Sequence, residues 1–140
     1  LLMYGKLDLT ERGTDGTLVI TDFKTGKPKT ISEIEKLDDD GRLSSYMRQL
    51  AMYSYLVSGA EKGKTVSASK LLFLEAGAND KHALYSTFID TEKIDLLKRD
   101  IEDYIESIEN GEWVNRECHY KSWGTNKDEC EYCALVKKII

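Results

Sequence analysis

The chain has 140 residues, of which 41% are hydrophobic and 32% charged, a balance typical of a globular domain rather than a disordered chain. It has no apolar run of roughly 18 residues and no basic leader followed by an apolar segment, so we expect neither a membrane span nor a secretory signal. The net charge of −5 disfavours a protein that only coats DNA, although local basic patches and bound cations also decide nucleic-acid contact.

Cysteine usage and the start of the chain add two expectations. The sequence contains 3 cysteines and no leader, which favours a reducing compartment, and we expect a cytoplasmic protein. The chain begins at Leu1 without an initiator methionine and continues directly into an apolar segment. We therefore expect a fragment of a longer protein.

The first part of the chain predicts a β-hairpin. Leu1–Leu9 has the composition of a strand, Glu11–Gly16 is rich in turn residues, and Thr17–Lys24 forms a second, β-branched run. A loop at Thr14-Asp15-Gly16, with its glycine in the left-handed conformation, would centre the pairing on Asp15.

This register predicts a pair of opposed carboxylates. Pairing centred on Asp15 places Asp8 directly across the hairpin from Asp22, where two like charges destabilise a sheet unless a cation lies between them. Lys24 shares the face of Asp22, and Phe23 points to the opposite side. One interpretation is a divalent-metal site with a catalytic lysine beside it. The alternative is an ordinary solvated sheet face.

Residues 26–42 read as a loop with weak helical character at I-S-E-I-E-K. Lys27, Lys29 and Lys36 within the segment, together with Lys24 just before it, make this region locally basic. It is either a solvated loop or a phosphate-contacting one.

For the rest of the core, the sequence predicts a helix, a β-hairpin and a second helix. The predicted elements are a helix at Leu43–Ser58, strands at Val66–Glu75 and His82–Asp90, and a helix at Thr91–Asn110. Ser44 or Ser45 is expected to cap the first helix and Gly59 to end it. Thr91 is expected to cap the second helix, and Gly111 to end it.

Residues 112–140 form a distinct tail that contains all the cysteines. Cys130 and Cys133 form a C-x-x-C pair, and Cys118 is followed directly by His119. These residue types favour metal or cluster ligation. The alternatives that remain open are a zinc site, an iron–sulfur cluster, and free buried thiols without a metal.

Three sequence motifs resemble those of a known family. They are G-K-L-D at Gly5–Asp8, V-I-T-D-F-K-T-G-K at Val19–Lys27 and R-Q-L-A-M-Y-S-Y-L at Arg48–Leu56. Their order and spacing resemble the PD-(D/E)xK nuclease superfamily and, within it, the RecB-like branch found in helicase–nucleases and phage-type exonucleases.

The resemblance implies a fold. We expect an α/β restriction-endonuclease-like core with a mixed central sheet of about four strands flanked by helices. Residues 1–111 would form this core without the N-terminal helix of the fold. Residues 112–140 would form a tail packed on the same domain.

The resemblance also implies a divalent-metal-dependent DNA nuclease, in particular an exonuclease of DNA recombination, repair or phage DNA processing. Mg²⁺ or Mn²⁺ is the expected cofactor, DNA the partner, and a helicase domain or subunit a further partner. Asp8, Asp22 and Lys24 would be catalytic, with the metal held by Asp8, Asp22 and the backbone carbonyl of Phe23. Gln49, Tyr53 and Lys27 would support the site and contact DNA. The alternative is a weakly active or inactive DNA-binding or assembly module that keeps the fold.

Overall fold

The structure is a computed structural model that describes residues 3–61, 64–76, 82–111, 135 and 138. Its elements are β1 (Leu9–Arg12), β2 (Leu18–Lys24), α1 (Ile31–Glu35), α2 (Ser45–Ala60), β3 (Val66–Ala76), β4 (His82–Thr87) and α3 (Thr91–Glu109). The chain divides into two units, residues 1–100 and 101–140, and the sheet, α1 and α2 lie in the first.

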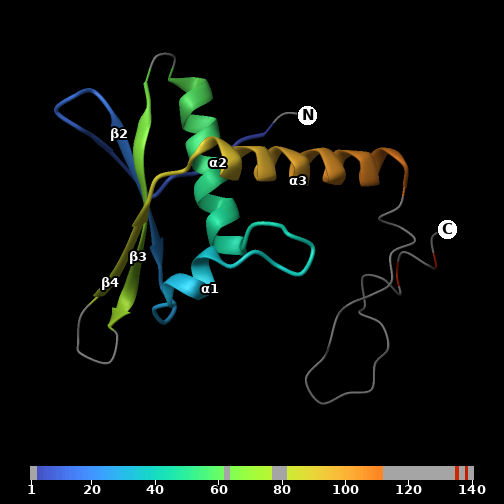
Figure 1. The fold of residues 1–140 in the computed structure, drawn as a ribbon, viewed down its shortest axis with the longest axis horizontal. Coiled ribbons are helices and arrows are strands. Elements are labelled where there is room, and N and C mark those ends of the chain that lie inside the picture. Colours follow the sequence, from blue (N-terminus) through green and yellow to red (C-terminus); the bar gives the residue numbers. More distant parts are fainter. Residues whose placement is uncertain (1–2, 62–63, 77–81, 112–134, 136–137, 139–140) are drawn as a thin grey trace. The chain divides into compact units, whose positions relative to one another are not determined.

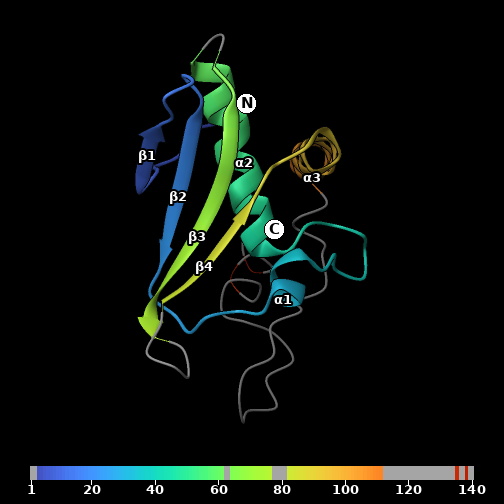
Figure 2. The same ribbon diagram turned by 60° about the vertical axis from the view of Figure 1, so that its left-hand side comes forward.

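A mixed four-stranded sheet forms the centre of the first unit (Figure 2). The strands follow the order β1-β2-β3-β4. The outer pairs are antiparallel, and the central β2–β3 pair is parallel. Parallel strands need a long crossover connection, and α1 and α2 provide it. The predicted fold class, a mixed sheet flanked by helices, is confirmed.

The hairpin has the register that the sequence predicted. Leu9 pairs with Thr21 and Arg12 with Leu18, so the pairing is centred on Asp15. Gly16 has φ 81°, which is the left-handed conformation expected of it. Asp15 Oδ1 accepts hydrogen bonds from both the amide and the hydroxyl of Thr17, and this hydroxyl lowers the pKa of Asp15.

The predicted first strand, Leu1–Leu9, is wrong in its limits. Residues 3–8 lie outside the sheet, and β1 runs from Leu9 through Arg12, into the segment expected to be a turn. At Asp8 the side-chain carboxylate accepts the Phe23 amide at 2.8 Å. The Phe23 amide is therefore not available for a backbone hydrogen bond between the strands. The pairing of β1 with β2 accordingly begins at Leu9, one residue after Asp8.

Helix α2 lies along one face of the sheet (Figure 1). Ser44 caps it as expected, since its hydroxyl accepts the Met47 amide at 3.1 Å. The predicted stop at Gly59 is wrong, because the helix continues to Ala60 and Glu61 donates to the Val57 carbonyl. The core between helix and sheet is built from the buried side chains Leu18, Ile20, Met47, Leu50, Ala51, Val66, Leu71 and Phe73.

Helix α1 is short but firmly capped. Thr30 and Glu33 form a capping box, and the hydrogen bonds from Thr30 lower the pKa of Glu33. The Tyr85 hydroxyl of β4 donates to Glu35 at 2.8 Å and so connects α1 to the sheet. Burial raises the pKa of Tyr85 to about 12, and the adjacent Glu35 carboxylate contributes in the same direction.

Helix α3 begins at Thr91, but Asp90 rather than Thr91 caps it. Asp90 Oδ1 accepts the Lys93 amide at 2.9 Å, and the Asp90 carbonyl accepts the Ile94 amide. The expectation for Thr91 was therefore wrong by one residue. The expected end at Gly111 is confirmed, because this glycine has φ 67° and donates to the Ile108 carbonyl. Within the described parts of the chain, no helix is both long and apolar enough to cross a membrane.

We expect Asp90→Ala to lower the free energy of unfolding by about 1 kcal/mol, a typical value for a lost N-cap. Hydrogen bonding to Lys93 lowers the pKa of Asp90. The ionised cap therefore stabilises the fold above the ordinary aspartate pKa, and its contribution is lost as the pH falls through the lowered value. Urea denaturation at pH 7 measures the difference. The matched control is Thr91→Ala, and an equal or larger loss in that variant would contradict the assignment.

Candidate active site

The end of β2 carries an acidic residue and a lysine on the face covered by α2. Leu18 and Ile20 on this face are core residues, and the alternation brings Asp22 and then Lys24 to the same side. Asp22 is therefore buried, with 4% of its surface exposed. Lys24 Nζ lies 2.7 Å from Asp22 Oδ2, and the two form an ion pair whose lysine end is closer to solvent.

Gln49 of α2 joins both members of this pair. Its Nε2 donates to Asp22 Oδ1 at 3.1 Å, and its Oε1 accepts from Lys24 Nζ. Gln49 Nε2 also donates to the Tyr53 hydroxyl at 2.9 Å. The four residues predicted from β2 and α2 therefore form one hydrogen-bonded group. We call it the acid–lysine site.

The donors and acceptors of Gln49 are fixed by this arrangement. Both hydrogens of its amide nitrogen are used, one toward Asp22 and one toward Tyr53, while its oxygen faces the lysine ammonium. The Tyr53 hydroxyl accepts a hydrogen bond there, and its own proton remains available to another acceptor.

Asp8 lies at the rim of the site. It is exposed, and its Oδ2 accepts the Phe23 amide at 2.8 Å. The hairpin register, continued by one residue beyond the Leu9–Thr21 pair, puts Asp8 across from Asp22. The sequence predicted a role for the carbonyl of Phe23. The contact made by its amide, which holds the Asp8 carboxylate in place, was not predicted.

Tyr46 is a member of the site that the sequence reasoning missed. Lys24 Nζ lies 5.7 Å from the centre of its ring, within the range of a cation–π contact. The same ring packs edge-to-face on Phe73, with 6.0 Å between ring centres. Its position three residues before Gln49 was an available signal, since residues three apart share a helix face.

The donor set fits a hard divalent cation. Asp22 Oδ2 is buried and, apart from its ion pair with Lys24, has no hydrogen-bond partner among the described residues. An oxygen left in this state is a natural metal ligand, and carboxylate oxygens are what Mg²⁺ prefers. Across the described residues, no group of three or more histidine, cysteine, aspartate and glutamate side chains is arranged to hold a metal. A site here would therefore use two carboxylates and backbone oxygen.

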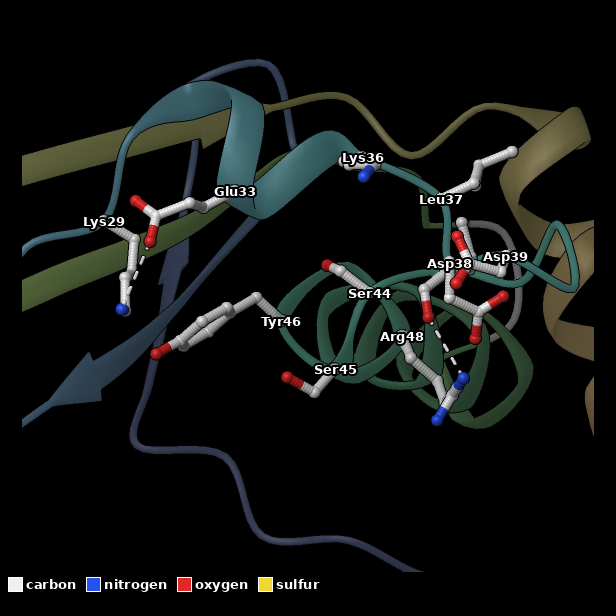
Figure 3. Close-up of a pocket in the computed structure, with 11 residues that line it drawn as sticks. Lys29, Glu33, Lys36, Leu37, Asp38, Asp39, Ser44, Ser45, Tyr46 and Arg48 are labelled. Atoms are coloured by element: carbon white, nitrogen blue, oxygen red, sulfur yellow. Dashed lines mark hydrogen bonds and ion pairs between the residues drawn. The ribbon is translucent and has the colours of Figure 1, made fainter.

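A polar cleft of about 590 Å³ adjoins the site between α1 and the start of α2 (Figure 3). Tyr46 lines it and also contacts Lys24, so the cleft and the site share a wall. Its other charged side chains are of both signs, with Lys29 paired to Glu33. Arg48 also lines the cleft, and its Nε bonds Asp100 of α3 at 3.0 Å.

Lys27 is exposed in the loop after β2 and takes no part in the acid–lysine site. Cys118, His119, Cys130 and Cys133, the expected ligands of a second metal or cluster, lie outside the described residues.

The fold and this site define an α/β domain with an aspartate and a lysine at the end of its second strand, held by a glutamine from the following helix. A family model described as the PD-(D/E)XK nuclease superfamily matches residues 1–137, and the chain therefore belongs to that superfamily. Members of this superfamily are generally nucleases, act on DNA and typically use Mg²⁺ or Mn²⁺. Comparisons with curated proteins and with solved structures gave no match.

We expect Gln49→Glu to destabilise the protein although the two side chains have nearly the same shape. The substitution replaces a donor by an acceptor that faces Asp22 Oδ1, and a buried acceptor left unpaired costs about 1–3 kcal/mol. Urea denaturation in the presence of a chelator measures this loss. Tyr53→Phe, which removes a single hydroxyl from the same group, should cost about 1 kcal/mol or less. Equal stability of Gln49→Glu and the natural protein would contradict the assigned amide orientation.

Proposed function

We propose that this protein is a divalent-metal-dependent deoxyribonuclease that hydrolyses phosphodiester bonds at the acid–lysine site. The observation that carries the proposal is the burial of Asp22, whose two oxygens meet Gln49 and Lys24 at 3.1 and 2.7 Å. Aspartate side chains are rarely buried unless they are paired or take part in a functional site. Here the buried aspartate lies beside a lysine at the end of β2. Membership of a nuclease superfamily supports the same conclusion.

The carboxylates of Asp8 and Asp22 and the backbone carbonyl of Phe23 would hold Mg²⁺ or Mn²⁺. Bound there, the ion supplies a water nucleophile near neutral pH and relieves charge on the non-bridging phosphate oxygens. The Phe23 amide restrains the Asp8 carboxylate from one side. Gln49 restrains Asp22 through Oδ1, so Oδ2, which also lies 2.7 Å from Lys24 Nζ, would be its ligand oxygen.

Lys24 would stabilise the charge that develops on the phosphorus centre, or orient the attacking water. Its ammonium is held in position by Asp22, by the Gln49 oxygen and by the ring of Tyr46, so little reorganisation is needed during the reaction. The Tyr53 hydroxyl can donate its remaining proton to a phosphate oxygen. Lys27, exposed nearby in the sequence, would contact the DNA backbone without sequence preference.

The finer assignment is a RecB-like exonuclease of DNA recombination, repair or phage DNA processing, with a helicase domain or subunit as partner. It is supported by the spacing of G-K-L-D, D-F-K-T-G-K and Q-L-A-M-Y along the chain. It is also supported by the direct contacts among Asp22, Lys24, Gln49 and Tyr53, which are residues of the second and third of these motifs.

The purified protein should cut DNA when Mg²⁺ or Mn²⁺ is supplied and should stop when the metal is chelated. Asp22→Asn and Lys24→Met should each lower the cleavage rate by about 10²–10³-fold, the usual effect of removing one group that stabilises charge in a transition state. The matched control is Asp95→Asn on the exposed surface of α3, which should cut normally. Unchanged cleavage by the Asp22 and Lys24 variants would refute the proposed site.

The exonuclease assignment predicts that linear DNA is degraded while closed circular single strands of the same sequence are left intact. End-labelled linear DNA should release mononucleotides or short products from one end. Cleavage of circular and linear substrates at equal rates would instead identify an endonuclease.

A metal titration separates the nuclease from a non-catalytic DNA-binding module. Isothermal titration with Mn²⁺ should detect binding to the natural protein. Asp8→Asn should weaken binding by about tenfold or more, since even outer-shell partners of a metal are worth that much. The asparagine oxygen can still accept the Phe23 amide, so the variant isolates the charge. Absence of Mn²⁺ binding, together with DNA binding without cleavage, would favour the module.

A further inference from the structure

An apolar cavity of about 330 Å³ lies on the other side of the acid–lysine site from the polar cleft, between residues 3–7 and α2. Its walls on the helix side are Tyr53, Leu56, Val57 and Ala60. None of its lining residues is charged. The polar cleft, in contrast, is lined by three lysine and arginine side chains and three carboxylates.

The apolar cavity is joined to the site through shared residues. The ring of Tyr53 lines the cavity, while its hydroxyl accepts a hydrogen bond from Gln49, which in turn holds Asp22. Leu7 lines the cavity from the opposite wall and directly precedes Asp8 in the chain. A molecule in the cavity would therefore contact Tyr53, which is connected to Asp22 through Gln49, and Leu7, which is the chain neighbour of Asp8.

Gly5 lines the cavity and has no side chain to fill it. A Cβ at this position would lie 3.5 Å from both Leu56 Cδ1 and Tyr53 Cε1, so it would point at the helix wall. Three lining residues, Leu7, Tyr53 and Val57, also pack on the core cluster of Leu18, Ile20 and Val66, which anchors both walls of the cavity to the core. Tyr4, with 91% of its surface exposed, stands at its opening as an unused aromatic ring.

We propose that the apolar cavity binds an unpaired nucleobase of the DNA strand whose phosphate is being cut. The inference rests on the proposed nuclease function, because that function brings a phosphate to Asp22. A nucleotide carries a flat aromatic base one sugar away from its phosphate, and an uncharged cavity lined by two tyrosines suits that base but not a phosphate. A base can enter only when it is unstacked and unpaired, so the substrate is a single strand or a frayed end.

Abasic-site scanning tests the proposal. Single-stranded oligonucleotides that lack one base at successive positions around the cut are digested by the natural protein. We expect loss of the base at one fixed position to lower kcat/KM by about 5- to 100-fold, the range of base–aromatic contacts, while other positions change little. A flat profile overturns the proposal.

Gly5→Leu should fill the cavity, so that removing the base from the substrate no longer changes the cleavage rate. The variant should cut the intact oligonucleotide as slowly as it cuts the abasic one, and both proteins should cut the abasic oligonucleotide at the same rate. Ser58→Leu introduces the same side chain at an exposed position of α2 outside the cavity and should behave as the natural protein. Tyr4→Ala should reduce the difference in cleavage rate between the intact and the abasic oligonucleotide. Tyr4 is exposed, so this change should not affect folding. Natural kinetics in Gly5→Leu overturn the proposal.

A binding measurement keeps the cavity testable even if the protein does not cut DNA. An oligonucleotide with a single 2-aminopurine at each position in turn is bound in the presence of a chelator, and its fluorescence is recorded. We expect a change at one position with the natural protein and with Ser58→Leu, and its loss with Gly5→Leu. If only the nuclease proposal is wrong, the protein will not cut DNA but the fluorescence change at one position will still be observed. Failure of the base site appears as no signal, or as the same signal in Gly5→Leu.

Discussion

The ion pair between Asp22 and Lys24 is the interaction on which the site depends. Removing a carboxylate and an ammonium from water is costly, and taking away one partner of such a pair typically costs about 3–5 kcal/mol. Asp22 is buried and Lys24 keeps 22% of its side-chain surface exposed, so the cost falls mostly on the aspartate. A purely structural core would be as stable with an apolar pair of similar volume. The charges are therefore better explained by chemistry than by stability.

Gln49 stabilises the Asp22–Lys24 ion pair and restricts which side chains are compatible with it. It compensates both charges with a single uncharged side chain, with its nitrogen at the aspartate and its oxygen at the lysine. A carboxylate at this position would leave Asp22 without its donor, and an apolar side chain would remove the contacts with both charges. The same amide donates to the Tyr53 hydroxyl, so a residue that lines the apolar cavity is connected to the ion pair through Gln49. Asp22 and Lys24 on β2 thus position Gln49, and Gln49 in turn positions the Tyr53 hydroxyl.

Much of the fold and site could be predicted because local rules were sufficient. The left-handed glycine at Gly16 fixed the register of the hairpin, and alternation along β2 then placed Asp22 and Lys24 on one face. The failures came where a side chain replaced a backbone group. The Asp8 carboxylate took the Phe23 amide and ended the ladder, and Asp90 took the amide expected to be capped by Thr91. Composition alone does not reveal which of two adjacent polar residues makes such a contact. Neither does it reveal that Gly5 lines a cavity against a helix that lies far away in the sequence.

Helix α2 shows how one element serves the core and the site together. Its buried positions Met47, Leu50 and Ser54 face the sheet. The site positions Tyr46, Gln49 and Tyr53 each precede one of these by a single residue, so they form a parallel stripe turned by about 100° around the helix axis. Packing of the first stripe therefore fixes the orientation of the second, and the stripe meets β2 where the strand changes from apolar to charged. Tyr46 lines the polar cleft and Tyr53 the apolar cavity. These two residues lie about two turns apart on the same stripe, so the site has chemically different sides along the helix axis. Under the proposed function, a DNA strand crossing the site would meet polar side chains on one side and apolar side chains on the other.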